Sequence, residues 1–145
     1  MSSNIYTAGL NNVGSYQVSG APYATGSLTS PAAGSTPISI QFPYVTQWVK
    51  VIPITGSVAS HLRIGFSENG VKNGNYYRLF AGQNANHEAV APEPIRVKVS
   101  ELYFCSDNSA TIEFDVVAGL TNIPTARVDN IGPSGSNWSG SIGVG

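Results

Sequence analysis

The stretch ISIQFPYVTQWVKVIPI (residues 38–54) decides the fold class, because it contains two β-strand patterns in succession. Apolar side chains alternate with Ser and Gln over residues 38–42, and this two-residue period is typical of a strand with one buried face. Pro43 ends that strand or confines it to a sheet edge, because proline lacks the N–H that an inner strand needs. A second strand follows over residues 48–54 and is interrupted by Pro53.

The same alternation recurs further along the chain. Residues 62–66 predict a third strand, and residues 76–80 predict its return partner. Between them SENGVKNGN (residues 67–75) contains Asn-Gly twice, which is the strongest short hairpin signal, so we expect a tight hairpin here. Helix signals are weak, since only residues 81–94 leave room for one short turn before two prolines stop it.

A pair of oppositely charged strand patterns follows. Residues 95–99 alternate apolar side chains with Arg and Lys, and residues 112–116 alternate them with Glu and Asp. The first pattern slips by one residue near Ser100 and continues through residues 102–104, which indicates a β-bulge. We expect these two strands to form one hairpin that turns at residues 107–109, with their charges facing outward.

Short strands separated by Gly and Asn turns predict an all-β chain, folded as an antiparallel β-sandwich or jelly roll. A length of 145 residues fits a single domain. By composition, residues 1–36 form an uncharged N-terminal arm or edge strand, residues 37–124 form the sandwich core, and residues 125–145 form a Gly/Ser-rich C-terminal tail.

Charge is confined to the middle of the chain, where the first charged residue is Lys50 and the last is Asp129. Charged residues make up 10% of the chain, against about 25% in an ordinary soluble domain. The ends instead carry hydroxyl, amide, aromatic and small side chains. Such segments are buried without the desolvation cost of charges, so we expect the ends to lie against other protein.

Aromatic and aliphatic side chains recur every few positions in the N-terminal arm, which indicates an ordered segment rather than a plain linker. They dock either on the chain's own sandwich or on a neighbouring chain, and the sequence leaves both alternatives open. In the tail, the single aromatic side chain is a candidate anchor into a groove on this or another subunit. The candidate partner contacts are Tyr6, Leu10, Tyr16, Tyr23 and Trp138.

Several classes of chemistry find no signature in the sequence. Seven scattered Lys and Arg residues do not make the basic patch of a nucleic-acid-binding domain, and no apolar run approaches the ~18 residues that span a bilayer. Cys105 is expected as a small buried side chain, and His61 and His87 as solvated residues at segment edges. We therefore expect no catalytic residue, no metal, no cofactor, no nucleic acid and no membrane.

Three stretches resemble one known family. They are IYTAGLNNVGSYQVSGAPYATGS (residues 5–27), ISIQFPYVTQWVKV (residues 38–51) and FDVVAGLTNIPTA (residues 114–126). Together they look like a family of small proteins of marine bacteriophages, with virion surface components such as capsid decoration or knob proteins and short head fibres. The resemblance implies a non-enzymatic, oligomeric β-rich protein of the virion, assembled in the host bacterial cytoplasm and bound to the major capsid protein or another virion protein.

Two alternatives stay open at this point. One is a carbohydrate-binding module of a head or tail fibre that meets a host surface glycan, since aromatic and amide side chains in sandwich loops suit sugar recognition. Its candidate contacts are Asn73, Tyr76 and Tyr77, with Trp138 as a further ring. The other alternative is a structural component of the tail or neck.

Overall fold

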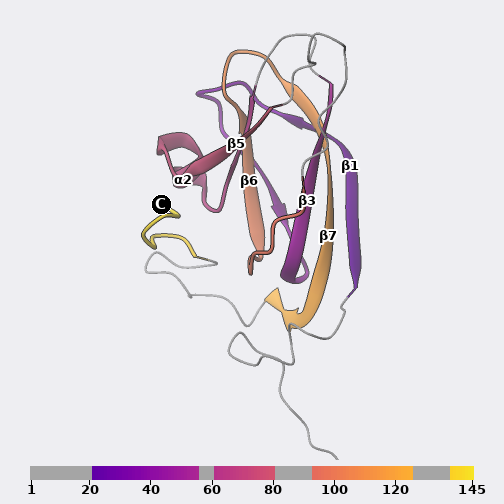
Figure 1. Ribbon diagram of the computed structural model, residues 1–145. Coiled ribbons are helices and arrows are strands. Elements are labelled where there is room, and N and C mark those ends of the chain that lie inside the picture. Colours follow the sequence, from indigo (N-terminus) through magenta and orange to yellow (C-terminus); the bar gives the residue numbers. More distant parts are fainter. Residues whose placement is uncertain (1–20, 56–60, 81–92, 126–137) are drawn as a thin grey trace, which may run out of the picture.

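The computed structural model describes residues 21–55, 61–80, 93–125 and 138–145, and these segments form two antiparallel β-sheets that pack face to face (Figure 1). The three-stranded sheet has the order β1-β7-β3, with β1 at Pro22–Ser30, β7 at Ile112–Pro124 and β3 at Tyr44–Thr55. The four-stranded sheet has the order β2-β6-β4-β5, with β2 at Ile38–Gln41, β6 at Glu101–Ser106, β4 at His61–Gly65 and β5 at Tyr76–Phe80. The prediction of an all-β, antiparallel chain is confirmed, whereas the jelly-roll topology stays a prediction.

The core lies between the two sheets and is organised by β7. Alternate side chains of this strand, from Ile112 through Phe114 to Leu120, are buried, while Glu113 between them is exposed. The Phe114 ring meets the Phe104 ring of β6 with centroids 4.6 Å apart and an interplanar angle of 38°, so the two sheets are joined by a direct aromatic contact. Leu62 and Ile64 of β4 are fully buried in the same cluster.

Pro43 and Pro53 both lie where a missing backbone N–H breaks no hydrogen bond between strands, Pro43 after the end of β2 and Pro53 in the edge strand β3. The strand predicted over residues 38–42 is confirmed as β2, which ends immediately before Phe42 and Pro43. The second predicted strand is longer than expected and runs through Pro53, which lies opposite Phe114 of β7. Because β3 is at the edge of its sheet, a proline there removes no hydrogen bond to a further strand, so it does not interrupt the strand.

The predicted hairpin over residues 67–75 is wrong in its connection, although β4 and β5 do pair antiparallel as expected. A short helix, α2 (Glu68–Asn73), joins the two strands. The Ser67 side chain accepts a hydrogen bond from the Gly70 N–H and caps the first turn, and Gly74 takes a left-handed conformation (φ 114°) that ends the helix. The second Asn-Gly pair therefore terminates a helix instead of forming a hairpin turn. Val71 is buried against the sheet and gives the helix its tertiary support.

The predicted strand over residues 95–99 is also wrong, since only Ile95 makes a β-bridge, to Val49 of β3. Beyond that bridge the backbone bonds are sparse, from the Thr46 N–H to the Val99 carbonyl at 2.9 Å and from the Phe42 N–H to the Ser100 carbonyl at 2.8 Å, and the Thr46 side chain supplements them. The Thr46 hydroxyl donates to the Val97 carbonyl at 2.6 Å and accepts from the Val99 N–H at 3.1 Å. The phase slip that predicted a bulge marks the junction between this side-chain-bonded segment and β6.

The predicted hairpin between the basic and acidic stretches does not form. β6 belongs to the four-stranded sheet and β7 to the three-stranded sheet, so the chain crosses between layers after Ser106. Both strands carry one strongly apolar face, and these faces meet across the core. Burying them contributes more free energy than exposed ion pairs between adjacent strands would. Among the described residues the ion pairs are instead Arg63–Asp107, Arg78–Asp107 and Lys72–Glu68.

Replacing the Thr46 hydroxyl tests how residues 97–99 are held. Thr46→Val keeps the shape of the buried side chain but leaves the Val97 carbonyl and the Val99 N–H without their partner, so the free energy of unfolding should fall by about 3 kcal/mol. Thr46→Ser keeps the hydroxyl and should cost only about 1 kcal/mol for the lost methyl group. Urea denaturation measures both, and a Val variant as stable as the Ser variant would contradict the assignment.

Candidate functional site

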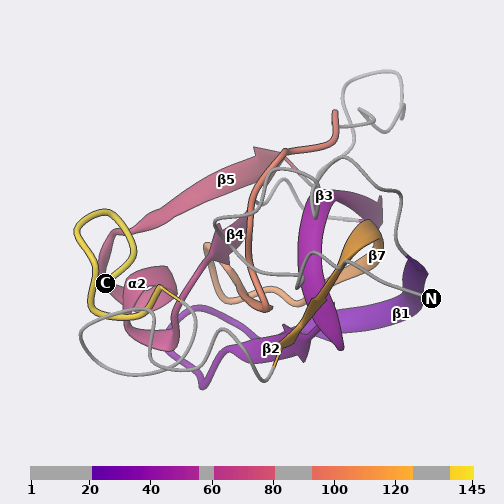
Figure 2. The same cartoon turned by 90° about the horizontal axis from the view of Figure 1, so that it is seen from below.

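One side of the sandwich is built from strands that carry no charge. Residues 21–49 contain no Asp, Glu, Lys or Arg, and they supply β1 and β2, which are the edge strands of the two different sheets. Figure 2 shows these two strands running along the same side of the molecule. We call this surface the charge-free side. The exposed side chains of the two strands are small or polar and neutral, and they include Ala24 and Thr29 on the three-stranded sheet and Ser39 and Gln41 on the four-stranded sheet. Acidic residues of the neighbouring strands border them, since Glu113 lies opposite Thr29 and Glu101 lies opposite Gln41.

Tyr23 of β1 packs against Phe42, the residue that immediately follows β2. Its ring meets the Phe42 ring edge-on, with centroids 5.0 Å apart and planes at 75°. Leu28 is half-buried against the same core. Of the predicted partner contacts, Tyr23 therefore packs on its own chain, whereas Tyr6, Leu10 and Tyr16 lie outside the described residues.

β1 carries a bulge that shapes this edge. Its pairing with β7 shifts between Thr25 and Leu28, and Ser27 has a left-handed backbone conformation with φ 58°. The Ser27 N–H donates to the Asp115 carboxylate at 2.8 Å, which holds the bulge in place. A bulge of this kind divides the free edge into two short segments and limits uncontrolled strand pairing.

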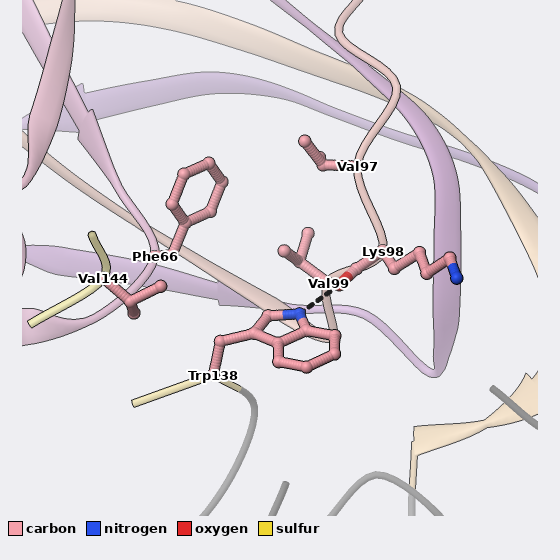
Figure 3. Close-up of a pocket in the computed structure, with 6 residues that line it drawn as sticks. All are labelled: Phe66, Val97, Lys98, Val99, Trp138 and Val144. Carbon is pink, nitrogen blue, oxygen red and sulfur yellow. Dashed lines mark hydrogen bonds between the residues drawn. The ribbon is translucent and has the colours of Figure 1, made fainter. Parts of the chain in front are cut away.

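The C-terminal segment lies beside α2, away from β1 (Figure 1), and Figure 3 shows its Trp138 and Val144 side chains in a pocket with Phe66 and Val99. The Trp138 ring lies against a group of apolar side chains, and its Nε1–H donates to the Lys98 carbonyl. A cavity of about 290 Å³ remains beside the ring. The cavity is lined by Phe66, Val97, Lys98, Val99, Trp138 and Val144. The tail aromatic predicted as a groove anchor thus occupies a groove on its own chain.

The far end of this segment is held on α2. The Ser67 hydroxyl, which already caps the helix, donates to the Val144 carbonyl at 2.9 Å. Gly70 lies directly beneath this carbonyl, and a Cβ on residue 70 would collide with the Val144 oxygen. Gly70 sits in a helix and has no positive φ, so its lack of a side chain serves the close approach of the C-terminal backbone.

A polar cluster covers part of the outer face of the four-stranded sheet. The Asp107 carboxylate accepts from Arg63 Nε at 2.5 Å and from Arg78 Nε at 3.0 Å. Both guanidinium groups also lie over the Tyr76 ring, at 4.5 Å and 5.1 Å from its centroid, and Arg78 donates to the Tyr76 hydroxyl at 3.1 Å. The cluster ties β4, β5 and the segment after β6 together.

The cluster shifts the pKa values of its members in opposite directions. Partial burial raises the pKa of Asp107, but the hydrogen bond and positive charge of Arg63, with the charge of Arg78, outweigh it and leave that pKa below its ordinary value. Burial lowers the pKa of Arg63, but the hydrogen bond and charge of Asp107 more than compensate, so the pKa is raised. Both shifts favour the charged pair.

The residues predicted for glycan contact do not share one surface. Tyr76 and Tyr77 are neighbours on β5 and point to opposite faces, with Tyr76 under the arginines and Tyr77 packed against the core. Burial raises the Tyr77 pKa. Asn73 lies in α2, where its side-chain amide donates to the Asn69 side-chain oxygen at 2.6 Å. Sugar binding by these residues stays a prediction.

Cys105 is buried on β6, as expected, with its thiol 3.9 Å from the Val71 carbonyl. Burial raises its pKa, although Arg63 lies directly opposite on β4 and opposes the shift. Arg63 is far from Cys105 in the sequence, and the pairing of β4 with β6 brings the two residues together. His61 begins β4 and is exposed, while His87 lies outside the described residues.

Comparisons with protein-family models, with characterised proteins and with solved structures found no match. Within the described segments no three His, Cys, Asp or Glu side chains gather into a group that could hold a metal ion. Nor is any helix of these segments long and apolar enough to cross a membrane.

The lowered pKa of Asp107 predicts a pH-dependent loss of stability. At neutral pH, Asp107→Asn should reduce the free energy of unfolding by on the order of 1 kcal/mol, because the amide attracts the two guanidinium groups more weakly. The wild-type contribution is present above the ordinary aspartate pKa of about 4 and is lost as the pH falls through the lowered value.

Denaturant unfolding between neutral and strongly acidic pH measures this difference. The gap between wild type and Asp107→Asn should close in acid. The matched control Glu113→Gln, at an exposed position on β7, should leave the free energy of unfolding at neutral pH nearly unchanged. A gap that stays constant down to about pH 2 would mean that Asp107 stabilises the fold by its shape alone.

Proposed function

We propose that the chain is a non-enzymatic structural protein of a phage virion, a capsid decoration or knob module attached through its charge-free side. The observation that carries this proposal is the use of the uncharged residues 21–49 for the edge strands of both sheets. The sequence resemblance to virion surface proteins of marine bacteriophages supports the same role.

Physical chemistry makes such a surface suitable for permanent attachment. Charged side chains lose hydration when they are buried, and that cost is often not recovered by pairing. Neutral hydroxyl, amide and small side chains avoid this loss, and an edge strand offers free backbone groups that can extend a neighbouring sheet. An interface of this kind depends little on ionic strength, because few charges are screened.

The remaining surface suits exposure to solvent. The charges of the described residues lie on the other strands, on α2 and on the loops, and they include the Arg63–Asp107–Arg78 cluster and the Lys72–Glu68 pair. Two of the acidic residues, Asp115 and Glu101, contact Ser27 of β1 and Gln41 of β2. A module with a neutral attachment side and a charged outer surface stays soluble before assembly and remains hydrated on the particle. The major capsid protein is the partner that this proposal names, with further copies of the chain as neighbours.

Quantitative mass spectrometry of purified particles tests the role. Hundreds of copies per particle are expected for a decoration protein that follows the capsid lattice, whereas about six or twelve copies would assign the chain to the tail or neck. Absence from washed particles would overturn the proposal.

Two lysine variants test the attachment surface in the same experiment. Ser39→Lys adds a charge to the exposed face of β2 and should lower the copy number severalfold, because the charge must be desolvated on attachment. The matched control Asn69→Lys adds the same charge on the exposed surface of α2 and should leave the copy number unchanged. Equal copy numbers for the two variants would remove the charge-free side as the contact.

A further inference from the structure

We propose that the groove between α2 and residues 95–99 is a peptide-docking site for the C-terminal segment, and that this segment is exchangeable between two copies of the chain. We call Trp138–Gly145 the plug, and we call the surface formed by Phe66, Ser67, Gly70, Val97 and Val99 the plug groove. In this structure the plug occupies the groove of its own chain (Figure 3). The inference stands independently of the virion role.

The plug holds its own shape. Its backbone forms hydrogen bonds from Ser141 N to Trp138 O, from Val144 N to Ser141 O and from Gly140 N to Gly145 O, each 3.0 Å long. Gly140 and Gly143 have positive φ angles of 85° and 88°, which other residues rarely adopt. A segment folded by its own turns needs little help from the surface on which it docks.

The groove is built to receive this backbone. Gly70 lacks the Cβ that would block the Val144 carbonyl, although its helical conformation does not itself require glycine. Ser67 uses one hydroxyl twice, accepting from the Gly70 N–H and donating to the Val144 carbonyl. At the other end the Lys98 carbonyl accepts from Trp138. Backbone-directed contacts at both ends fix the register of the plug.

The plug nevertheless fills its groove incompletely. Trp138 and Val144 are only partly buried, and Ile142 between them is fully exposed. The cavity of about 290 Å³ beside the Trp138 ring opens to solvent. A ring that borders an open cavity makes fewer contacts than one in a close-packed interior, so the free energy that holds the plug on its groove is smaller.

Chain length permits exchange. The twelve positions from 126 to 137 connect the last described residue of the sandwich region to the plug, and an extended connection of that length spans up to about 40 Å. An intramolecular plug acts at an effective concentration in the millimolar range, so its own plug wins in dilute solution. When copies of the chain are held side by side or at high concentration, a second groove is present at a comparable concentration, and exchange then links two subunits.

A complementation experiment with full-length chains tests the proposal. Gly70→Val blocks the groove but keeps the plug, whereas Trp138→Ala weakens the plug but keeps the groove. Mixing the two chains, one of them isotopically labelled, should produce a one-to-one complex in native mass spectrometry. This mixed complex should be at least about tenfold more abundant than the dimer that either variant forms with a labelled copy of itself. Only the mixed pair combines an intact, undocked plug with an unblocked groove.

Controls keep the outcome interpretable. Both variants must retain the far-ultraviolet circular dichroism of wild type, and Gly70→Ala is the milder substitution if Gly70→Val does not fold. Lys72→Ala, at an exposed position of the same helix, does not block the groove, so this chain keeps its own plug docked. Mixed with Trp138→Ala, it should form no more complex than wild type does. Folded Gly70 and Trp138 variants that form no mixed complex would overturn the proposal and make the plug a fixed part of one subunit.

Discussion

The apolar face of β7 packs against the four-stranded sheet, and the rest of the structure depends on this contact. Phe114 meets Phe104 across the two layers, and alternate residues of β7 on either side are buried with it. β7 also pairs with both β1 and β3, so every strand of its sheet is positioned through it. Because the chain must cross between layers to bring β6 and β7 face to face, the loop between them places Asp107 beside Arg63 and Arg78.

The same arrangement separates three surfaces. β1 and β2 are left at the edges of different sheets on one side, and both come from the uncharged part of the chain. The charged cluster lies on the outer face around β4 and β5, where it is hydrated. α2, which covers part of this sheet, provides Ser67 and Gly70 for the C-terminal segment. The uncharged edge strands, the charged cluster and the docking site of the C-terminal segment therefore all follow from the same packing of the two sheets.

The sequence predicts most strands because their two-residue period reports a buried face directly, as in the strands over residues 38–41 and 61–65. It fails where a side chain or a cap replaces the expected backbone pattern. Asn73-Gly74 has hairpin chemistry but ends a helix that Ser67 begins. Residues 95–99 alternate like a strand, yet they are held by a few backbone bonds to β3 together with the Thr46 hydroxyl. Trp138 could be singled out as an anchor from its polar surroundings, but its groove depends on segments far apart in the chain, which periodicity does not reveal.

Hydrogen exchange of the chain, free in solution and bound to the particle, tests most directly whether the charge-free side is the attachment surface. The account predicts that backbone amides of β1 and β2 exchange at least about tenfold more slowly on the particle, because their outward-facing groups gain partners there. Amides of β4 and β5, beneath the charged cluster, should exchange at the same rate in both states. Protection that appears on β4, β5 or α2 while β1 and β2 remain unchanged would contradict the account.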